Sequence, residues 1–381
     1  MLYNSLSNVF IKIDEIDLLS LLQQVQAANS DSVLSNYPDL KKDLVKAKII
    51  VESDEQEILR IKYLQRIIRH DKHVIPLTVL PTLSCNFKCP YCFEKKGKIE
   101  RMNKTAISGI VKLVKTIADE NTRKTLVNLT WMGGEPLMNF NDMTILTTKL
   151  QETNVNLQAK IITNGYLLTK NVIEQMPAMN VYLTQVTIDG LKEQHNKTRM
   201  HVKDTNSFDK IIENLFISPG FIEDIKGDKK GSVKCEFDTT AIKDFYKEMF
   251  LRKVTNYSVY PRNIVNECAV RSPNSFSIGP KGELYSCWEN IGYKEHIIGQ
   301  VDKDGKVFIT KELEYLRYML CADYLDDPKC LKCFFFPICS GGCPEKRIRN
   351  EFCGANFDNC SMHKKHLEEL LDFHYYKKYK Q

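Results

Sequence analysis

The stretch VIPLTVLPTLSCNFKCPYC, residues 74–92, decides the fold. Its first seven residues form an apolar, β-branched run that ends at Pro81, which is typical of a buried strand. Cys85, Cys89 and Cys92 follow directly as a CxxxCxxC motif on a short loop. Three thiolates on one tight loop can hold three irons of a [4Fe–4S] cluster and leave the fourth iron without a protein ligand, which is the vacant position that catalysis requires. Zinc is the alternative, but its fourth ligand would have to come from a distant part of the chain.

Strands followed by polar or glycine residues recur further along the chain. We expect strands at residues 126–131, 160–162 and 181–188, and a helix over residues 107–117, whose apolar positions keep helical spacing. Successive βα units place the ends of their strands at one edge of a parallel sheet. The sequence therefore predicts an α/β fold with a ligand site at that edge.

The residues at these strand ends resemble the radical S-adenosylmethionine (radical SAM) superfamily. In that family an aromatic residue precedes the third cysteine of the loop, and Tyr91 stands there. Residues 131–136, WMGGEP, resemble the GGEP motif, which receives the amino group of the bound methionine moiety. Residues 163–165, TNG, resemble the strand end on the ribose side. Residues 187–199, with Glu193 and His195 after TIDG, resemble the stretch that holds the ribose and the methionine carboxylate.

The resemblance implies a partial (β/α)6 barrel that binds S-adenosylmethionine beside a [4Fe–4S] cluster. Besides the catalytic Cys85, Cys89 and Cys92, the implied cofactor-binding residues are Tyr91, Gly133, Gly134, Glu135, Pro136, Thr163, Asn164, Thr187, Asp189 and Arg199. Cleavage of the sulfonium by one electron would yield a 5′-deoxyadenosyl radical, which must form in a closed cavity poor in water. We interpret Trp131 as barrel packing and His195 as a surface histidine without a catalytic role.

The chain holds 13 cysteines, and most of them lie in its last quarter. Nothing signals secretion, so thiolates for metal binding or catalysis are favoured over disulfides. By spacing alone, zinc and iron–sulfur fit the C-terminal cysteines about equally. Their spacing also resembles the seven-cysteine SPASM domain, which follows radical SAM barrels and carries two auxiliary [4Fe–4S] clusters. The resemblance assigns one cluster to Cys330, Cys333, Cys339 and Cys360, and the other to Cys268, Cys287 and Cys343.

The second of these sets lacks a fourth cysteine. Either a residue other than cysteine completes it, or one iron stays open toward the substrate. Cys235, Cys321 and Cys353 lie outside the motif, and a buried apolar cysteine is the expectation for each.

Four regions are expected along the chain: an N-terminal module (1–72), the barrel (73–262), the SPASM domain (263–362) and a basic tail (363–381). In the first, strands near 9–13 and at 49–51 alternate with a helix through Leu18 and Val25, one beginning at Pro38, and one capped by Asp54 with Ile58, Ile61 and Leu64 on one face. This order suits a small α+β module of winged-helix type, or an extension packed on the main domain.

The later part of the barrel is less clear from the sequence. One strand (233–237) and one helix (242–251) are expected between residues 208 and 260. The span from Asp189 to Cys268 is short for the last strands of a full (β/α)6 half-barrel.

Composition bounds the function. The 381 residues carry a net charge of +6, and this charge is too diffuse to indicate that the protein binds nucleic acid. No apolar run is long enough to cross a bilayer, and acidic residues come too early for a secretion signal. We expect a soluble cytoplasmic protein.

SPASM relatives mostly act on peptides, and residues 1–72 loosely resemble the modules that bind the leader of a precursor peptide as an added strand. We therefore expect a peptide maturase that takes electrons from a flavodoxin or ferredoxin and installs a side-chain cross-link, with a thioether favoured over a carbon–carbon bond. Trp288 stands where sulfatase-maturing enzymes have an aspartate, which disfavours formylglycine formation. The alternatives are an enzyme like the sulfatase maturases, a radical SAM enzyme for a small molecule, and a metal-binding scaffold without activity.

Overall fold

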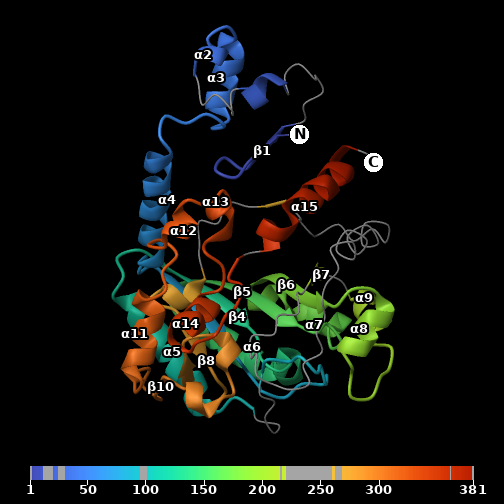
Figure 1. The fold of residues 1–381 in the computed structure, drawn as a ribbon. Coiled ribbons are helices and arrows are strands. Elements are labelled where there is room, and N and C mark those ends of the chain that lie inside the picture. The colour runs from blue at the N-terminus through green and yellow to red at the C-terminus, as the bar shows by residue number, and fades with distance from the viewer. Residues whose placement is uncertain are drawn as a thin grey trace.

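The structure is a computed structural model that describes residues 2–11, 20–24, 31–94, 101–214, 217–219, 260–261, 268–360 and 362–379 (Figure 1). Its main feature is a nine-stranded sheet in the order β11-β10-β9-β8-β3-β4-β5-β6-β7. The strands on one side of the sheet are β3 (Val74–Val79), β4 (Thr125–Trp131), β5 (Val155–Thr163), β6 (Val181–Ile188) and β7 (Ile217–Pro219), all parallel. This confirms the predicted α/β class with a parallel sheet. Within the described strands, no pairing closes the sheet into a barrel.

The C-terminal part of the chain extends the same sheet. β8 (Phe276–Ile278) pairs in parallel with the other edge of β3. β9 (Glu283–Tyr285), β10 (Gly299–Val301) and β11 (Val307–Ile309) then follow as antiparallel neighbours. The strand that carries the CxxxCxxC loop is therefore flanked by the predicted barrel on one side and by the cysteine-rich region on the other.

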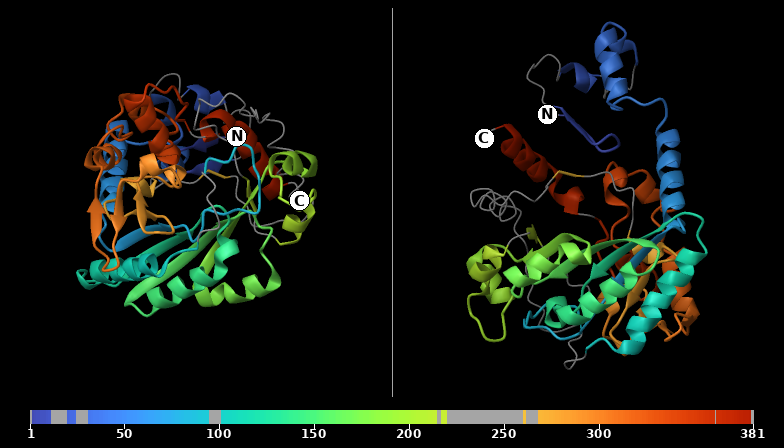
Figure 2. Two further views of the ribbon diagram at one scale, coloured as in Figure 1. Left: turned by 90° about the horizontal axis from the view of Figure 1, so that it is seen from below. Right: turned by 180° about the vertical axis from the view of Figure 1, so that it is seen from behind.

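Helices α5 (Lys104–Asp119) and α6 (Phe140–Gln151) lie on one face of the parallel strands (Figure 2). Ile107, Ile110 and Val114 of α5 are buried in the main core, as their helical spacing predicts. The smaller helices are α7 (Lys170–Gln175), α8 (Lys192–Thr198) and α9 (Ser207–Glu213). The predicted strands are confirmed, except that β5 begins five residues before position 160, because alternate residues from Val155 onward are buried.

The N-terminal region comprises β1 (Leu2–Asn4), β2 (Val9–Ile11), α2 (Asp31–Leu34), α3 (Pro38–Lys46) and α4 (Asp54–Arg69). The prediction of a strand at 49–51 is wrong. The backbone N–H groups of Ile49 and Ile50 both donate to the carbonyl of Leu44 (2.9 and 3.3 Å) and so close the end of α3 instead of pairing with a strand. Ser53, and not Asp54, caps α4 by accepting the N–H of Gln56.

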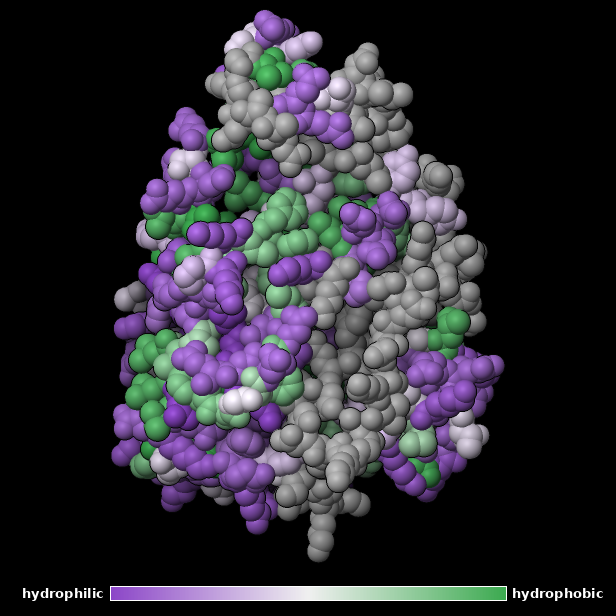
Figure 3. All heavy atoms as spheres, viewed as in Figure 1, coloured by the Kyte–Doolittle hydropathy of each residue, from purple (hydrophilic) through white to green (hydrophobic). Residues whose placement is uncertain are grey.

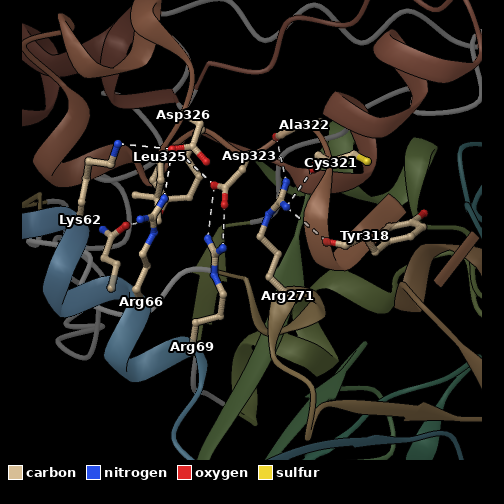
Figure 4. Close-up of polar contacts among 12 residues, drawn as sticks. Lys62, Arg66, Arg69, Arg271, Tyr318, Cys321, Ala322, Asp323, Leu325 and Asp326 are labelled. Carbon is tan, nitrogen blue, oxygen red and sulfur yellow. Dashed lines mark hydrogen bonds and ion pairs between the residues drawn. The ribbon is translucent and has the colours of Figure 1, made fainter. Parts of the chain in front are cut away.

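Helix α4 joins this region to the sheet and packs against the C-terminal region (Figure 4). Arg69 donates to Asp323 (2.6 Å), while Arg66 and Lys62 approach Asp326 (3.1 and 3.3 Å). The buried face of α4 is partly polar, because Gln65 accepts a hydrogen bond from the Tyr324 hydroxyl.

α4 also exposes apolar side chains. Leu59, Tyr63 and Ile67 are exposed and, with Lys62 and Arg66, line a groove of about 500 Å³. Leu64, predicted to share one face of the helix with Ile58 and Ile61, is exposed, whereas those two are half-buried. Apolar groups show at the surface around this helix and around α11 (Glu312–Leu320) in Figure 3.

The remaining C-terminal helices are α12 (Pro328–Leu331), α13 (Phe336–Cys339), α14 (Pro344–Phe352) and α15 (Met362–Tyr379). The described part of the tail expected at 363–381 thus forms a helix, and its Leu370 and Phe373 are buried in the main core. Among the helices of the described ranges, none is both long enough and apolar enough to span a membrane. The strand and helix predicted within 233–251, Cys235, and most of the helix predicted through Leu18 lie outside the described residues.

Candidate functional site

The turn after β4 lies directly against the loop that leads to Cys85. A Cβ atom on Gly134 would lie 2.2 Å from the carbonyl oxygen of Ser84, and one on Gly133 would lie 2.5 Å from that of Thr82. Gly133 also has a φ of +137°, which L side chains rarely adopt. Both glycines are therefore needed to bring the ends of β3 and β4 into backbone contact.

Glu135 joins the ends of β4 and β5. Its fully buried carboxylate accepts the Thr163 hydroxyl (2.7 Å) and the Leu137 N–H (3.0 Å) at Oε1, and the Asn164 N–H (2.8 Å) at Oε2. Burial raises the pKa of Glu135, and these hydrogen bonds oppose that shift. In this structure Glu135 thus holds two strand ends together at the predicted site.

Asn164 continues this connection to the cysteine loop. Its Nδ2 donates to Oδ1 of Asn86 (2.7 Å) and lies 3.9 Å from Sγ of Cys85. Its Oδ1 accepts the backbone N–H of Tyr166 (3.0 Å). The residue after β5 therefore fixes the first half of the loop.

A second group of polar side chains holds the other half of the loop. The Tyr91 hydroxyl donates to Oδ2 of Asp189, which follows β6, and Nη1 of Arg199 donates to the same hydroxyl (2.9 Å). Thr198 also donates to Oδ2 of Asp189 (2.9 Å). Burial raises the pKa of Tyr91, so its hydroxyl stays protonated.

His195 also supports this group, through the backbone of Asp189. It is fully buried, and its Nδ1 accepts the backbone N–H of Asp189 (3.3 Å). Burial, with a smaller contribution from Arg199, lowers its pKa to about 3, so the ring is neutral. The expectation of a surface histidine is wrong, because the ring packs inward against Phe208.

The predicted site thus draws together residues that follow four parallel strands. Cys85, Cys89 and Cys92 are partly exposed on the loop, whereas Trp131 is fully buried in the core, as expected. Gly133, Gly134, Glu135, Thr163, Asn164, Tyr91, Asp189 and Arg199 share backbone contacts or hydrogen bonds at this edge. Pro136 begins the 3-10 turn after Glu135, and Thr187 is half-buried near the end of β6. Thr198 and Asn86 were missed by the sequence reasoning, although each adjoins a predicted site residue.

The C-terminal cysteines fall into two neighbourhoods. Burial raises the pKa of Cys287, and the nearby charges of Glu345, Cys268 and Glu289 raise it further; Glu289 also lies near Cys343. Cys268, Cys287 and Cys343 thus share one acidic neighbourhood.

Basic side chains contact the other cysteine set. Lys364 donates to Sγ of Cys360 (3.4 Å) and is also near Cys333, while Arg347 donates to Sγ of Cys330 (3.5 Å). Cys339 ends α13 and is partly exposed.

The three cysteines outside the motif were expected to be buried and apolar. Cys321 is partly buried against the apolar side chains that pack around Cys287. Cys353 is exposed, so the expectation is wrong for Cys353. None of the 12 described cysteines forms a disulfide.

Residues 79–217 match the sequence model of the Radical SAM superfamily. They form a radical SAM domain, and the protein is an enzyme of that superfamily. Membership of an enzyme superfamily favours catalysis over the scaffold alternative.

Two curated relatives show how far the similarity extends. The chain is 21% identical over 351 residues to the radical SAM cyclopropyl synthase TigE of Paramaledivibacter caminithermalis, a match that covers 76% of this chain and 72% of that protein. It is 28% identical over 140 residues to the cysteine-type anaerobic sulfatase-maturating enzyme of Clostridium novyi, covering 35% of this chain and only 37% of that protein.

Among solved structures, the fold resembles anSMEcpe with bound AdoMet, with a TM-score of 0.56 and 16% identity over 80% of this chain and 97% of that one. It also resembles anSMEcpe with bound AdoMet and Cp18Cys peptide, with a TM-score of 0.54. At this identity the likeness establishes the fold alone.

The residues of the radical SAM domain fit adenosylmethionine and a [4Fe–4S] cluster. Oδ1 of Asp189 and Nε of Arg199 are buried beside the loop and make no hydrogen bond within the described residues. Across those same residues, no three His, Cys, Asp or Glu side chains converge on a point where a single metal ion would bind. A cluster needs no such convergence, because each thiolate binds its own iron.

Proposed function

We propose that this enzyme is a peptide maturase that removes hydrogen from a ribosomal precursor peptide and installs a side-chain cross-link. The observation that carries the proposal is the contact between the cysteine-rich region and the catalytic loop. The Tyr293 hydroxyl donates to the carbonyl of Phe93 (3.2 Å), the residue directly after Cys92. Because β8 also pairs with β3, the cysteine-rich region lies beside the radical SAM site. Metal bound there would serve an enzyme that oxidises its substrate.

Bound adenosylmethionine and the cluster at Cys85, Cys89 and Cys92 would supply a carbon radical that takes hydrogen from an unactivated position. Tyr91, Asp189 and Arg199 hold the loop, and Glu135 holds the strand ends around it. Gly133 and Gly134 bring backbone to the site without side-chain bulk. These residues would therefore bind and orient the cofactor, and the cysteine-rich region beside the loop would help to keep water out.

Two auxiliary [4Fe–4S] clusters are part of the proposal. Cys330, Cys333, Cys339 and Cys360 would hold one, and Cys268, Cys287 and Cys343 the other. The nearness of Cys268 to Cys287, and of both Cys287 and Cys343 to Glu289, supports the second set. The contacts of Arg347 and Lys364 with two thiols support the first. If the second set has no fourth ligand, one iron would stay open and could bind a substrate thiolate. This would favour a thioether over a carbon–carbon link.

The partner proposed is a precursor peptide whose leader binds the N-terminal module at 1–72. The peptide-bound structure of anSMEcpe supports a peptide in this fold. β1 and β2 form a separate two-stranded sheet with the hairpin geometry needed to accept an added strand. The electron donor would be a flavodoxin or ferredoxin, and the proposed location is the cytoplasm, where thiolates for metal binding are kept reduced.

Sulfatase-type formylglycine formation is the second candidate, favoured by the match to the Clostridium novyi enzyme. Trp288 argues against it: this side chain packs between Leu80 at the end of β3 and the core around Cys287, where a catalytic aspartate would be required.

The test is anaerobic incubation of the reconstituted protein with adenosylmethionine, a reductant and precursor peptides encoded beside its gene. A cross-link appears in mass spectrometry as the loss of two hydrogens from the peptide, whereas formylglycine from a cysteine appears as exchange of sulfur for oxygen together with the loss of two hydrogens. Cys89→Ala should abolish release of 5′-deoxyadenosine, whereas Cys353→Ala, a control at an exposed thiol outside both sets, should not. Release of 5′-deoxyadenosine without change in any peptide would refute the peptide substrate.

A further inference from the structure

The residue between Cys85 and Cys89 that is most deeply buried is Phe87, at 1% exposure. Its ring contacts His201 (centroids 5.3 Å apart, planes at 74°) and Tyr166 (6.0 Å, 72°), both in edge-to-face geometry. The predicted cofactor contacts include neither of these rings. A buried aromatic anchor inside a metal-binding loop fixes the positions of the thiols on both sides of it.

The backbone of the loop is held by the same segment. The Lys88 N–H donates to the carbonyl of Met200 (2.7 Å), the Val202 N–H donates to that of Asn86 (2.9 Å), and Phe87 faces His201 across an antiparallel bridge. We call residues 200–204 the clasp. Since Arg199 reaches Tyr91, one continuous stretch grips both halves of the loop.

His201 itself is locked in place. Its ring stacks on Tyr166 with centroids 4.0 Å apart and planes at 18°. Its Nδ1 accepts the N–H groups of Lys203 (3.2 Å) and Asp204 (2.9 Å), and burial lowers its pKa, so the ring is neutral. Tyr166 is held in turn, because its hydroxyl donates to Oδ2 of Asp204 (3.0 Å) and the Lys210 ammonium lies 4.0 Å from its ring centroid.

We propose that His201 and Tyr166 are positioning residues for the cluster-binding loop: their stacked rings hold Phe87 and so set where Cys85 and Cys89 present the cluster to adenosylmethionine. The proposal rests on the radical SAM domain and is independent of the peptide substrate. It separates two roles of His201, the aromatic ring that contacts Phe87 and the nitrogen that closes the turn of the clasp.

Two substitutions separate these roles. His201→Phe keeps a stacked ring and loses the acceptor. His201→Asn keeps a short side-chain acceptor that can close the same turn and loses the ring. His70→Asn, at an exposed position after α4, is the matched control.

The experiment uses the full chain, reconstituted with iron and sulfide and reduced without oxygen. The change that adenosylmethionine causes in the EPR spectrum is titrated, because it reports on the cluster that adenosylmethionine binds, at Cys85, Cys89 and Cys92. Loss of one aromatic contact corresponds to about 2- to 10-fold weaker binding. We expect His201→Asn to weaken adenosylmethionine binding by that factor and to alter the spectrum. His201→Phe and His70→Asn should stay near the wild type.

The proposal is overturned if His201→Asn behaves as His70→Asn does, or if His201→Phe is as impaired as His201→Asn. Should His201→Asn fail to fold, Tyr166→Phe carries the test, since it removes only the hydroxyl bond to Asp204 and should weaken binding by about 2-fold. An unchanged titration for that variant would then overturn the proposal. A wild-type protein without any adenosylmethionine-induced change would instead contradict the family-level chemistry on which the proposal rests.

Discussion

Replacing Arg69 by methionine should destabilise the protein far more than the same replacement of Arg66, one turn earlier on α4. Both arginines pair with an aspartate of the C-terminal region (Figure 4). The Arg69 and Asp323 side chains are only 6% and 9% exposed, with the nitrogen and oxygen 2.6 Å apart. The Arg66 and Asp326 side chains are 51% and 61% exposed, at 3.1 Å. The two pairs therefore differ chiefly in burial.

Burial sets the expected magnitudes. Removing one partner of a buried pair leaves an uncompensated charge and costs about 3–5 kcal/mol. An exposed pair is screened by water and contributes about 0–1 kcal/mol. Methionine keeps the apolar stem of arginine, so the packing of the helix changes little. The Leu325 N–H still donates to Asp323 (3.0 Å), and the Arg271 charge is nearby, so we expect the lower end of the buried range for Arg69→Met.

The assay is urea unfolding of the metal-free protein, followed by circular dichroism, together with hydrogen exchange of the α4 amides. A double-mutant cycle with Asp323→Asn isolates the pair from other effects of each substitution. Arg66→Met with Asp326→Asn gives the matched exposed cycle. The α4 amides should exchange faster in Arg69→Met and stay close to the wild type in Arg66→Met.

Equal losses of stability for the two arginines would show that burial is not what distinguishes them. A coupling energy below about 0.5 kcal/mol for Arg69 and Asp323 would show that this ion pair does not hold α4 in place.

Three further substitutions test residues at the edge of the sheet where the candidate site lies. Gly134→Ala should destabilise the protein by about 1–3 kcal/mol and abolish adenosylmethionine binding, because the new Cβ would lie 2.2 Å from the Ser84 oxygen; thermal unfolding and a binding titration measure this. Thr163→Val removes a 2.7 Å bond to the buried Glu135 carboxylate and should cost about 1.5–3 kcal/mol in urea unfolding. His195 has a pKa of about 3 when folded against a usual 6.5, so the unfolded chain binds an extra proton between these values and stability falls as pH drops through that window, by up to about 1.4 kcal/mol per pH unit. His195→Gln, which stays neutral, should make unfolding measured from pH 7 to pH 4 less acid-sensitive, and an unchanged slope would contradict the burial of the ring.

The sequence predicts the parallel sheet well, because each strand is a local run with glycine or proline close to its end and with buried residues at alternate positions. Residues 181–188 were expected as a strand and form β6 without a shift. The motifs at the strand ends also come together, since parallel strands leave them no other place to meet. Periodicity and turn residues are sufficient for this part of the fold.

Other features depend on contacts that a local pattern does not contain. Ile49 and Ile50 have the composition of a strand, but their amides complete the end of α3. His195 follows β6 among polar residues, yet the end of β6 turns it inward, where its Nδ1 is the acceptor for the Asp189 amide. The buried face of α4 contains Gln65 and Arg69. Their polar groups can be buried because Tyr324 and Asp323, which are distant in the sequence, pair with them. Polar contacts between residues distant in the sequence therefore determine these features, and the local hydrophobic pattern does not predict them.

The polar ties at the sheet edge also determine how the site should respond to its ligand. Glu135 after β4 is held by the end of β5, Asn164 after β5 holds the loop after β3, and Asp189 after β6 is held by that same loop through Tyr91. A buried polar network is stable only when its members are satisfied. Oδ1 of Asp189 and Nε of Arg199 remain without hydrogen bonds in the part of the chain that the structure describes. A ligand that satisfies these two atoms would complete a network that spans four strand ends, and should therefore order the whole edge of the sheet rather than a single loop.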